Sequence, residues 1–166
     1  LEKKIVDLIN AFKNNSYLHV IDEGTKLFSQ NNTIPVFANL VGASYASIND
    51  HVNAINFYKK ALEIDTNNFE ILNNLGKSQI ELLLYSDALN TFNKSLDINP
   101  NNYDTYFNLG IIFFEKENYE DALNCYLKAI ELNNKFDKLF YNVGILQTKI
   151  GKNKEAINYF EKTLEI

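Results

Sequence analysis

The sequence predicts an all-α solenoid of antiparallel helix pairs, because three kinds of residue recur along it every 34 positions. Glycine, alanine and a large aromatic residue each form a column of four members. The members are Gly42, Gly76, Gly110 and Gly144; Ala54, Ala88, Ala122 and Ala156; and Tyr58, Phe92, Tyr126 and Phe160. A fixed period of this length is typical of helical repeat proteins. Such a fold offers partners a long surface rather than a deep catalytic pocket.

Four repeat units follow from this register, and each predicts a helix A, a tight turn, a helix B and a linker. The units are 35–68, 69–102, 103–136 and 137–166. In the third unit apolar residues return every three or four positions, which marks one face of a helix, and Glu117 and Asn118 interrupt them. Asn and Pro residues in the linkers favour helix ends and turns. We expect A helices at 35–48, 69–82, 103–116 and 137–150, and B helices at 51–64, 85–98, 119–132 and 153–165.

Residues 1–34 form a fifth, degenerate unit in the same register. Tyr17 and Val20 stand three periods before the corresponding residues of the third unit, yet Leu8 occupies the glycine position and Gly24 the aromatic one. Two interpretations remain open. Either large and small residues have exchanged places at a helix contact and conserved its volume, or a terminal repeat has drifted because packing is absent on one side. We favour drift.

The third unit carries a recognisable set of residues at matching positions. They are Tyr106, Leu109, Gly110 and Phe113 in helix A, and Ala122, Tyr126 and Ala129 in helix B; the second unit adds Pro100. This pattern resembles the tetratricopeptide repeat family over residues 35–166. Mild departures are Ser95 and Thr163 for the second alanine, and Gln79 and Gln147 for the helix-A aromatic. The resemblance implies one right-handed superhelical domain over 1–166, with a concave groove lined by A helices that binds a peptide or a partner protein.

Composition excludes several classes of function. Apolar residues make up 46% of the chain, which argues against disorder. The net charge is −5 and no arginine is present, so binding to a nucleic acid backbone is not expected. No apolar run reaches membrane-spanning length. One cysteine, Cys125, and two histidines, His19 and His51, provide neither a metal-ligand spacing nor a nucleophile with a base. We expect no catalytic residues, no metal, no cofactor, no membrane contact and a cytoplasmic location.

The candidate binding face is the stripe of each A helix that lies opposite the predicted core positions. It carries polar residues in the second unit and a mixture of polar and apolar residues in the third and fourth. The predicted site comprises Asn73, Asn74, Lys77, Phe107, Asn108, Ile111, Lys138, Tyr141, Asn142 and Ile145. The four apolar members are as well explained by packing between neighbouring A helices. Glu81, Glu115 and Lys149 lie on the same stripe.

Asparagine occupies the sixth position of three successive units, at Asn74, Asn108 and Asn142. An amide both donates and accepts hydrogen bonds, so stacked amides can bind an extended peptide backbone of any sequence. This column resembles the asparagine ladder in the repeat domain of O-linked N-acetylglucosamine transferases. The alternative is that these amides only bond between adjacent helices. A clamp for a terminal carboxylate is not expected, because Asn73 and Phe107 stand where the family's clamp needs lysine.

The chain begins at Leu1 rather than Met and stops at Ile166 within the repeat pattern. We therefore expect a fragment of a longer bacterial protein. Two further functions stay open: an accessory, substrate-recruiting region of a glycosyltransferase or sulfotransferase, or a self-associating scaffold. For the scaffold, the C-terminal pair lacks a capping helix and is expected to expose Leu146, Ile150, Ile157 and Leu164 to a second copy.

Overall fold

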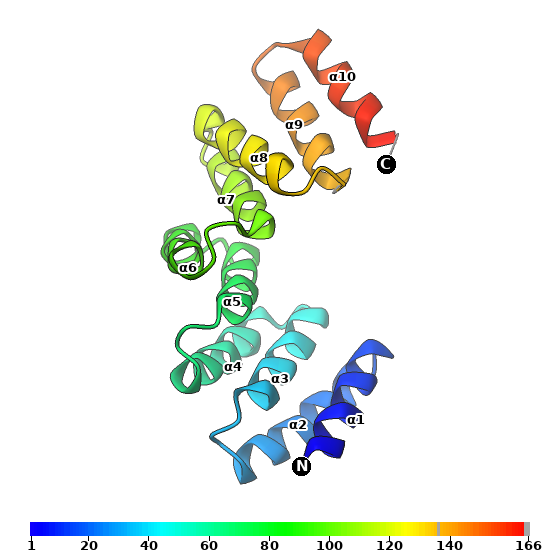
Figure 1. Ribbon diagram of the computed structural model, residues 1–166, viewed down its shortest axis with the longest axis vertical. Helices are drawn as coiled ribbons and strands as arrows, with labels where there is room; N and C mark the ends of the chain where they lie inside the picture. The colour runs from blue at the N-terminus through cyan, green and yellow to red at the C-terminus, as the bar shows by residue number, and fades with distance from the viewer. Residues whose placement is uncertain (136, 165–166) are drawn as a thin grey trace. The chain divides into compact units, whose positions relative to one another are not determined.

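The computed structural model describes residues 1–135 and 137–164, and within these ranges every regular element is an α-helix. Ten helices form consecutive antiparallel pairs (Figure 1). They are α1 (Glu2–Lys13), α2 (Tyr17–Gln30), α3 (Pro35–Ser47), α4 (His51–Ile64), α5 (Phe69–Glu81), α6 (Tyr85–Ile98), α7 (Tyr103–Glu115), α8 (Tyr119–Leu132), α9 (Asp137–Lys149) and α10 (Asn153–Leu164). The predicted all-α array of helix pairs is confirmed.

The observed bounds agree closely with the predicted ones. All eight helices of the four regular repeats begin at the predicted residue, and the four A helices end one residue earlier than predicted. The predicted end of the last helix, at 165, lies outside the described residues. The chain divides into two compact units, Leu1–Ile98 with α1–α6 and Asn99–Ile166 with α7–α10. The right-handed superhelical winding stays a prediction.

Each A helix closes in the same hydrogen-bonded turn. The residue two before each B helix has a positive φ: Asn15, Asn49, Leu83, Glu117 and Gly151. The next backbone N–H donates to the carbonyl five residues back, as Asp50 does to Tyr45 at 2.9 Å and Lys152 to Gln147 at 2.8 Å. This is the Schellman arrangement, which satisfies carbonyls at a helix end and reverses the chain. It explains how so short a break makes an antiparallel pair.

Asparagine and aspartate residues begin many of the helices. The side-chain oxygens of Asp50, Asn68, Asn102 and Asn118 each accept a hydrogen bond from the backbone N–H three residues later, over 3.1 to 3.5 Å. Such caps satisfy donors that the first helical turn leaves unpaired. Asn68, Asn102 and Asn118 therefore have a structural role as helix caps.

The glycine column lies where the two helices of a pair touch. A Cβ placed on Gly110 would lie 2.5 Å from Cδ1 of Tyr126, far closer than van der Waals contact allows. The same contact recurs between Gly42 and Tyr58, Gly76 and Phe92, and Gly144 and Phe160. Because glycine lacks a side chain, the ring of helix B can lie directly on the backbone of helix A. The aromatic column is thus packed against the glycine column in every regular repeat.

In the degenerate first pair the glycine lies on helix B and meets a different neighbour. Leu8 of α1 is 3% exposed, and its Cδ1 would lie 3.8 Å from a Cβ on Gly24 of α2, which is an ordinary van der Waals contact. The same Cβ would lie 2.6 Å from Cγ2 of Val41 on α3. The close approach that Gly24 permits is therefore with the next helix pair. The choice between a volume-conserving exchange and sequence drift stays open.

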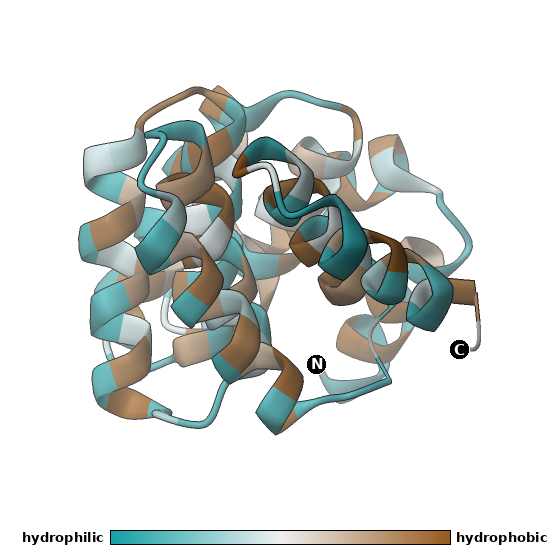
Figure 2. Cartoon of the chain, turned by 90° about the horizontal axis from the view of Figure 1, so that it is seen from above, coloured by the Kyte–Doolittle hydropathy of each residue, from teal (hydrophilic) through white to brown (hydrophobic). Residues whose placement is uncertain are grey.

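Hydrophobic and hydrophilic residues alternate along the helices (Figure 2), and the buried apolar residues form clusters within each unit. In Leu1–Ile98 the buried residues include Val20, Phe37 and Tyr58. In the compact unit Asn99–Ile166, Tyr126, Leu139 and Leu146 belong to one cluster, and Leu146 is fully buried. Leu146 was expected at an exposed C-terminal face, and that expectation is wrong, because its side chain points into this core.

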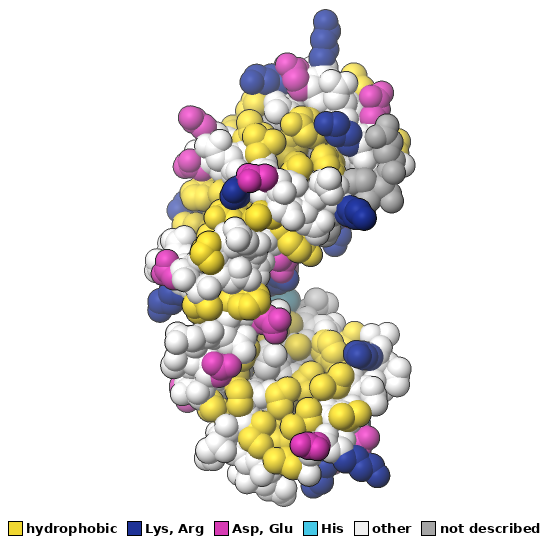
Figure 3. Space-filling view, in the orientation of Figure 1, with side chains coloured by type: hydrophobic (Ala, Val, Ile, Leu, Met, Phe, Trp, Pro, Cys, Tyr) yellow, Lys and Arg dark blue, Asp and Glu magenta, His cyan; other side chains and the backbone are white. Residues whose placement is uncertain are grey.

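The surface mixes apolar and charged side chains. On the face drawn in Figure 3, lysines and acidic residues are interspersed, and apolar side chains reach the surface between them. Among the described helices, none combines the length and the apolar character needed to cross a bilayer.

Candidate functional site

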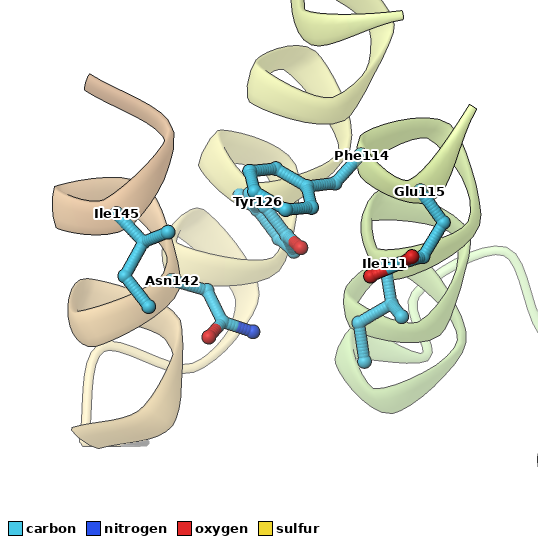
Figure 4. A pocket seen from close by; sticks show the side chains of 6 residues that line it. All are labelled: Ile111, Phe114, Glu115, Tyr126, Asn142 and Ile145. Atoms are coloured by element: carbon cyan, nitrogen blue, oxygen red, sulfur yellow. The ribbon is translucent and has the colours of Figure 1, made fainter. Parts of the chain in front are cut away.

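A cavity of about 300 Å³ opens between α7 and α9, within the compact unit Asn99–Ile166. Six residues line it: Ile111, Phe114 and Glu115 from α7, Tyr126 from α8, and Asn142 and Ile145 from α9. We call it the α7–α9 cavity. Figure 4 shows the α7 and α9 side chains facing each other, with Tyr126 between them. Its volume lies at the lower end of the range for ligand pockets, which suits one side chain of a ligand.

Helical spacing places these side chains on one surface. Ile111, Phe114 and Glu115 are three and four residues apart, so they share a face of α7, and Asn142 and Ile145 are related in the same way on α9. Phe114 is held by a tilted contact with Tyr119, whose ring centre lies 5.7 Å away. The walls are therefore carried by rigid helices rather than by loops.

Tyr126 brings a polar group to the base of this cavity. Its side chain is 2% exposed, and the ring packs between Gly110 and Phe107, whose ring centre is 6.1 Å away. Burial raises the pKa of the Tyr126 hydroxyl, and hydrogen bonding with the Asn142 side chain lowers it in part. The hydroxyl therefore stays protonated at neutral pH and is held beside the Asn142 amide.

A second cavity, of about 290 Å³, lies within Leu1–Ile98 between α3 and α5. We call it the α3–α5 cavity. Its lining residues are Phe12, Ala43, Ala46, Ser47, His51, Tyr58, Asn74, Lys77, Ser78 and Glu81. All six positions that line the α7–α9 cavity reappear here two repeats, or 68 residues, earlier. The same repeat positions thus line both cavities. The tyrosine (Tyr58 and Tyr126) and the asparagine (Asn74 and Asn142) are the same in both, and the residues at the other four positions differ.

The predicted site residues fall into three groups. Asn74 and Lys77 line the α3–α5 cavity, whereas Ile111, Asn142 and Ile145 line the α7–α9 cavity. Lys138 and Tyr141 are exposed, and the ring centres of Tyr141 and Phe160 lie 5.8 Å apart. Asn73, Phe107 and Asn108 are at most 9% exposed.

Hydrogen bonds explain the burial of the two asparagines. Asn73 Oδ1 accepts from Ser95 Oγ at 3.2 Å, within the α5–α6 pair. Asn108 Nδ2 donates to the Asp104 carbonyl at 2.7 Å, on its own helix. These two side chains therefore offer a ligand little free surface, and Asn74 and Asn142 are the sixth-position amides that reach a cavity.

Sequence reasoning placed Tyr58 and Tyr126 only in the core and did not assign Phe114 a role. A signal for the tyrosines exists. The aromatic column alternates Tyr58, Phe92, Tyr126 and Phe160, so a hydroxyl returns every second repeat, and both cavities contain one. The helix-A position with Gln79 and Gln147 alternates with the same double period.

The remaining candidates for chemistry are metal-ligand clusters, His51 and Cys125. Within 1–135 and 137–164, no three His, Cys, Asp or Glu side chains gather as metal ligands would. His51 lines the α3–α5 cavity, and its Nδ1 is buried without a hydrogen-bond partner among the described residues. Cys125 is a free, partly buried thiol, and burial with the nearby Asp121 charge raises its pKa to about 11. A thiol with so high a pKa is a weak nucleophile at neutral pH.

Solved structures show what this fold is similar to. MamA from Desulfovibrio magneticus RS-1 has a TM-score of 0.86 at 19% identity, with 98% of this chain and 93% of that chain covered. Pseudomonas aeruginosa PilF gives 0.89 at 17% identity, covering 99% and 75%. YrrB, described as a TPR protein with an unusual peptide-binding site, gives 0.75 at 17% identity, covering 97% and 83%. At these identities the likeness concerns the fold.

Sequence comparison gives the family. No curated protein matches the chain. The repeat families do match it: a TPR repeat at 42–82, and tetratricopeptide repeats at 103–136 and at 137–166, which together span more than half of the residues. These matches agree with the paired helices of the described residues, and the chain therefore belongs to the tetratricopeptide repeat family.

Proposed function

We propose that the chain is a protein-interaction module that binds an extended peptide segment of a partner across the faces of its A helices. Tetratricopeptide repeats are generally protein–protein interaction modules, and one protein of similar fold, YrrB, is described as having a peptide-binding site. The single observation that carries the proposal is the repeated cavity. A site of the same construction occurs in each compact unit, lined in both cases by residues of the predicted stripe.

The asparagines of the two cavities would hold the peptide backbone. Asn74 and Asn142 are partly exposed, and each lies at the cavity beside a buried tyrosine. A side-chain amide can donate to a peptide carbonyl and accept from a peptide N–H at once. The remaining lining residues would then select the side chains of the ligand, in the way that pockets along an extended peptide provide specificity.

A selection from a random peptide library tests the proposal. Twelve-residue peptides displayed on phage are selected on the immobilised chain, and individual peptides are then measured against two double variants. Asn74→Ala with Asn142→Ala should weaken binding by a similar factor for peptides of different sequence, because backbone groups are being bound. The matched control is Asn90→Ala with Asn124→Ala, which removes two exposed amides from the B helices α6 and α8.

Asn108 is kept in these variants because its amide bonds to its own helix, and removing it would mix stability with binding. Circular dichroism must show that both double variants keep the wild-type helix content. Equal losses in both double variants, or none in either, would contradict binding at the cavities.

Self-association is the second candidate, and exposed apolar residues near the C-terminal end favour it. Ile157 is 57% exposed and Leu164 is 88% exposed, both on α10. Apolar side chains left in water favour contact with a second copy. Sedimentation across a wide concentration range should reveal oligomers that Ile157→Glu removes. A strict monomer at millimolar concentration would refute this candidate.

A further inference from the structure

The α7–α9 cavity contains one charged group, the carboxylate of Glu115. Among the described residues, no lysine side chain lies within 4 Å of this carboxylate and no hydrogen bond offsets its charge. The other five lining residues are uncharged. Glu115, an exposed residue, is therefore the one charged member of the lining, and it is negative.

Two more polar side chains border the same space. Tyr126 contributes a protonated hydroxyl whose oxygen can accept a hydrogen bond. Figure 4 shows the amide nitrogen of Asn142 on the side of α7 and its oxygen turned away from it. The Glu115 carboxylate and the Tyr126 oxygen can together accept two N–H donors of an ammonium group, or part of a guanidinium.

The rest of the lining is apolar. Ile111 and Ile145 stand on opposite helices, and Phe114 lies next to them above Tyr126. A methylene chain entering between the two isoleucines would leave water and still keep its charged end at the polar side. Lysine and arginine bind in this divided manner, with the stem on apolar surface and the head on polar groups.

We propose that the α7–α9 cavity takes the side chain of a lysine or arginine residue of the bound partner peptide. Charge complementarity carries this choice, since an acidic ligand residue would meet Glu115 and a purely apolar one would leave its carboxylate unpaired. The inference rests on the proposed function, because it names the residue class that one of the two peptide-binding cavities selects.

The equivalent α3–α5 cavity is built differently at the deciding positions. Ser47 occupies the repeat position equivalent to Glu115, and Lys77 occupies the one equivalent to Ile145. The carboxylate is thus absent from that position, although Glu81 of α5 brings another one to the lining, and the Lys77 cation replaces one apolar wall. The proposed preference for a basic residue therefore concerns the α7–α9 cavity alone.

Methyl-labelled protein provides the test. The δ1 methyl groups of all isoleucines are labelled with ¹³C, and Ile111 and Ile145 report on the cavity, with the exposed Ile98 as a reference that does not line it. Capped pentapeptides Gly-Ser-X-Ser-Gly are titrated, with X as lysine, arginine, norleucine or glutamate. Norleucine has the lysine stem without the charge. Lysine and arginine should shift both reporter methyls and bind about fivefold more tightly than norleucine.

Three variants separate charge from structure. Glu115→Gln keeps the shape and should reduce the affinity for the lysine peptide to that for norleucine. Glu120→Gln makes the same change of net charge at an exposed residue of α8 outside the cavity, and it should leave binding unchanged. Tyr126→Phe should weaken lysine binding while preserving the fold, because phenylalanine occupies the same column at Phe92.

The outcomes are distinguishable. If norleucine binds as tightly as lysine, or if Glu120→Gln is as harmful as Glu115→Gln, the preference for a cation is wrong and peptide binding still stands. If neither these pentapeptides nor any library-selected peptide shifts the Ile111 and Ile145 methyls, the cavity is not a peptide site, and the proposed function fails with it for this unit.

Discussion

Exchanging the large and small residues of a helix contact should be far less damaging than changing either one alone. In the third repeat the Tyr126 ring lies on Gly110, whereas the first pair has Leu8 at the glycine position and Gly24 at the aromatic position. Gly110→Leu, Tyr126→Ala and the double variant therefore form a thermodynamic cycle. Its interaction term measures whether the two positions share one volume.

The single changes should both be costly. A Cβ on Gly110 would lie 2.5 Å from Cδ1 of Tyr126, so the ring must move by roughly 1 Å to restore contact at 3.5 Å or more. Because Tyr126 is 2% exposed and cannot swing into water, the overpacking should cost about 1–3 kcal/mol. Tyr126→Ala leaves a cavity and should cost about 3–5 kcal/mol. The double variant should cost about 1–3 kcal/mol less than the sum of the singles.

Urea-induced unfolding followed by far-UV circular dichroism gives the four free energies of unfolding, provided that the dependence on urea is the same for all variants. Gly42→Leu combined with Tyr126→Ala is the control, because Gly42 meets Tyr58 instead. Its two effects should add to within about 0.5 kcal/mol. If Gly110→Leu and Tyr126→Ala are also additive to this degree, the shared-volume explanation of both columns is wrong.

Three further predictions concern the turns, the caps and the thiol. Leu83→Asn should stabilise the fold by about 0.5–1 kcal/mol, because Leu83 is 70% exposed and holds a φ of 59°, which asparagine tolerates better than leucine. Gly151→Ala should destabilise the fold by about 1 kcal/mol, because the equivalent turn has a φ of 80°. The melting temperatures of the two variants should therefore shift in opposite directions. Asn102→Ala should lower the free energy of unfolding in urea by about 1 kcal/mol, because it removes the acceptor for the Thr105 N–H. Asn102→Asp supplies an equivalent acceptor and should keep the wild-type stability. Iodoacetamide should alkylate Cys125 at pH 8 about 100-fold more slowly in the folded chain than in urea, since burial raises its pKa from 9.0 to about 11. Folding favours the neutral thiol, so the contribution of this group to the free energy of unfolding is complete below pH 9 and is lost as the pH rises through about 11. Cys125→Ala should therefore flatten the dependence of the free energy of unfolding on pH between about 9 and 11. An unchanged dependence would contradict the raised pKa of Cys125.

The fold could be predicted from sequence because its determinants are periodic. One glycine, one alanine and one aromatic residue per 34 positions fix the register, and that register placed every regular helix to within a residue or so. Leu146 was misplaced because a helix face alone does not reveal how far the next helix covers it. The residue turned out fully buried.

The site was less predictable for a related reason. The stripe on each A helix could be read from sequence, but the depth of each position depends on hydrogen bonds across and along helices. Asn108 and Asn142 occupy the same repeat position, yet one amide bonds to its own helix and the other borders a cavity. The tyrosines were overlooked because a buried ring looks like core whether or not its hydroxyl reaches a cavity.

The α7–α9 cavity has a consequence for how such a chain can evolve. Its lining comes from two successive repeats, 103–136 and 137–166, so neither repeat contains the site. Exchanging one repeat for another would produce a new combination of walls without any new residue arising by mutation. In the function proposed above, recognition is thus a property of the junction between two repeats. Recombination at the linkers could assort ligand preferences in the way that it assorts whole domains.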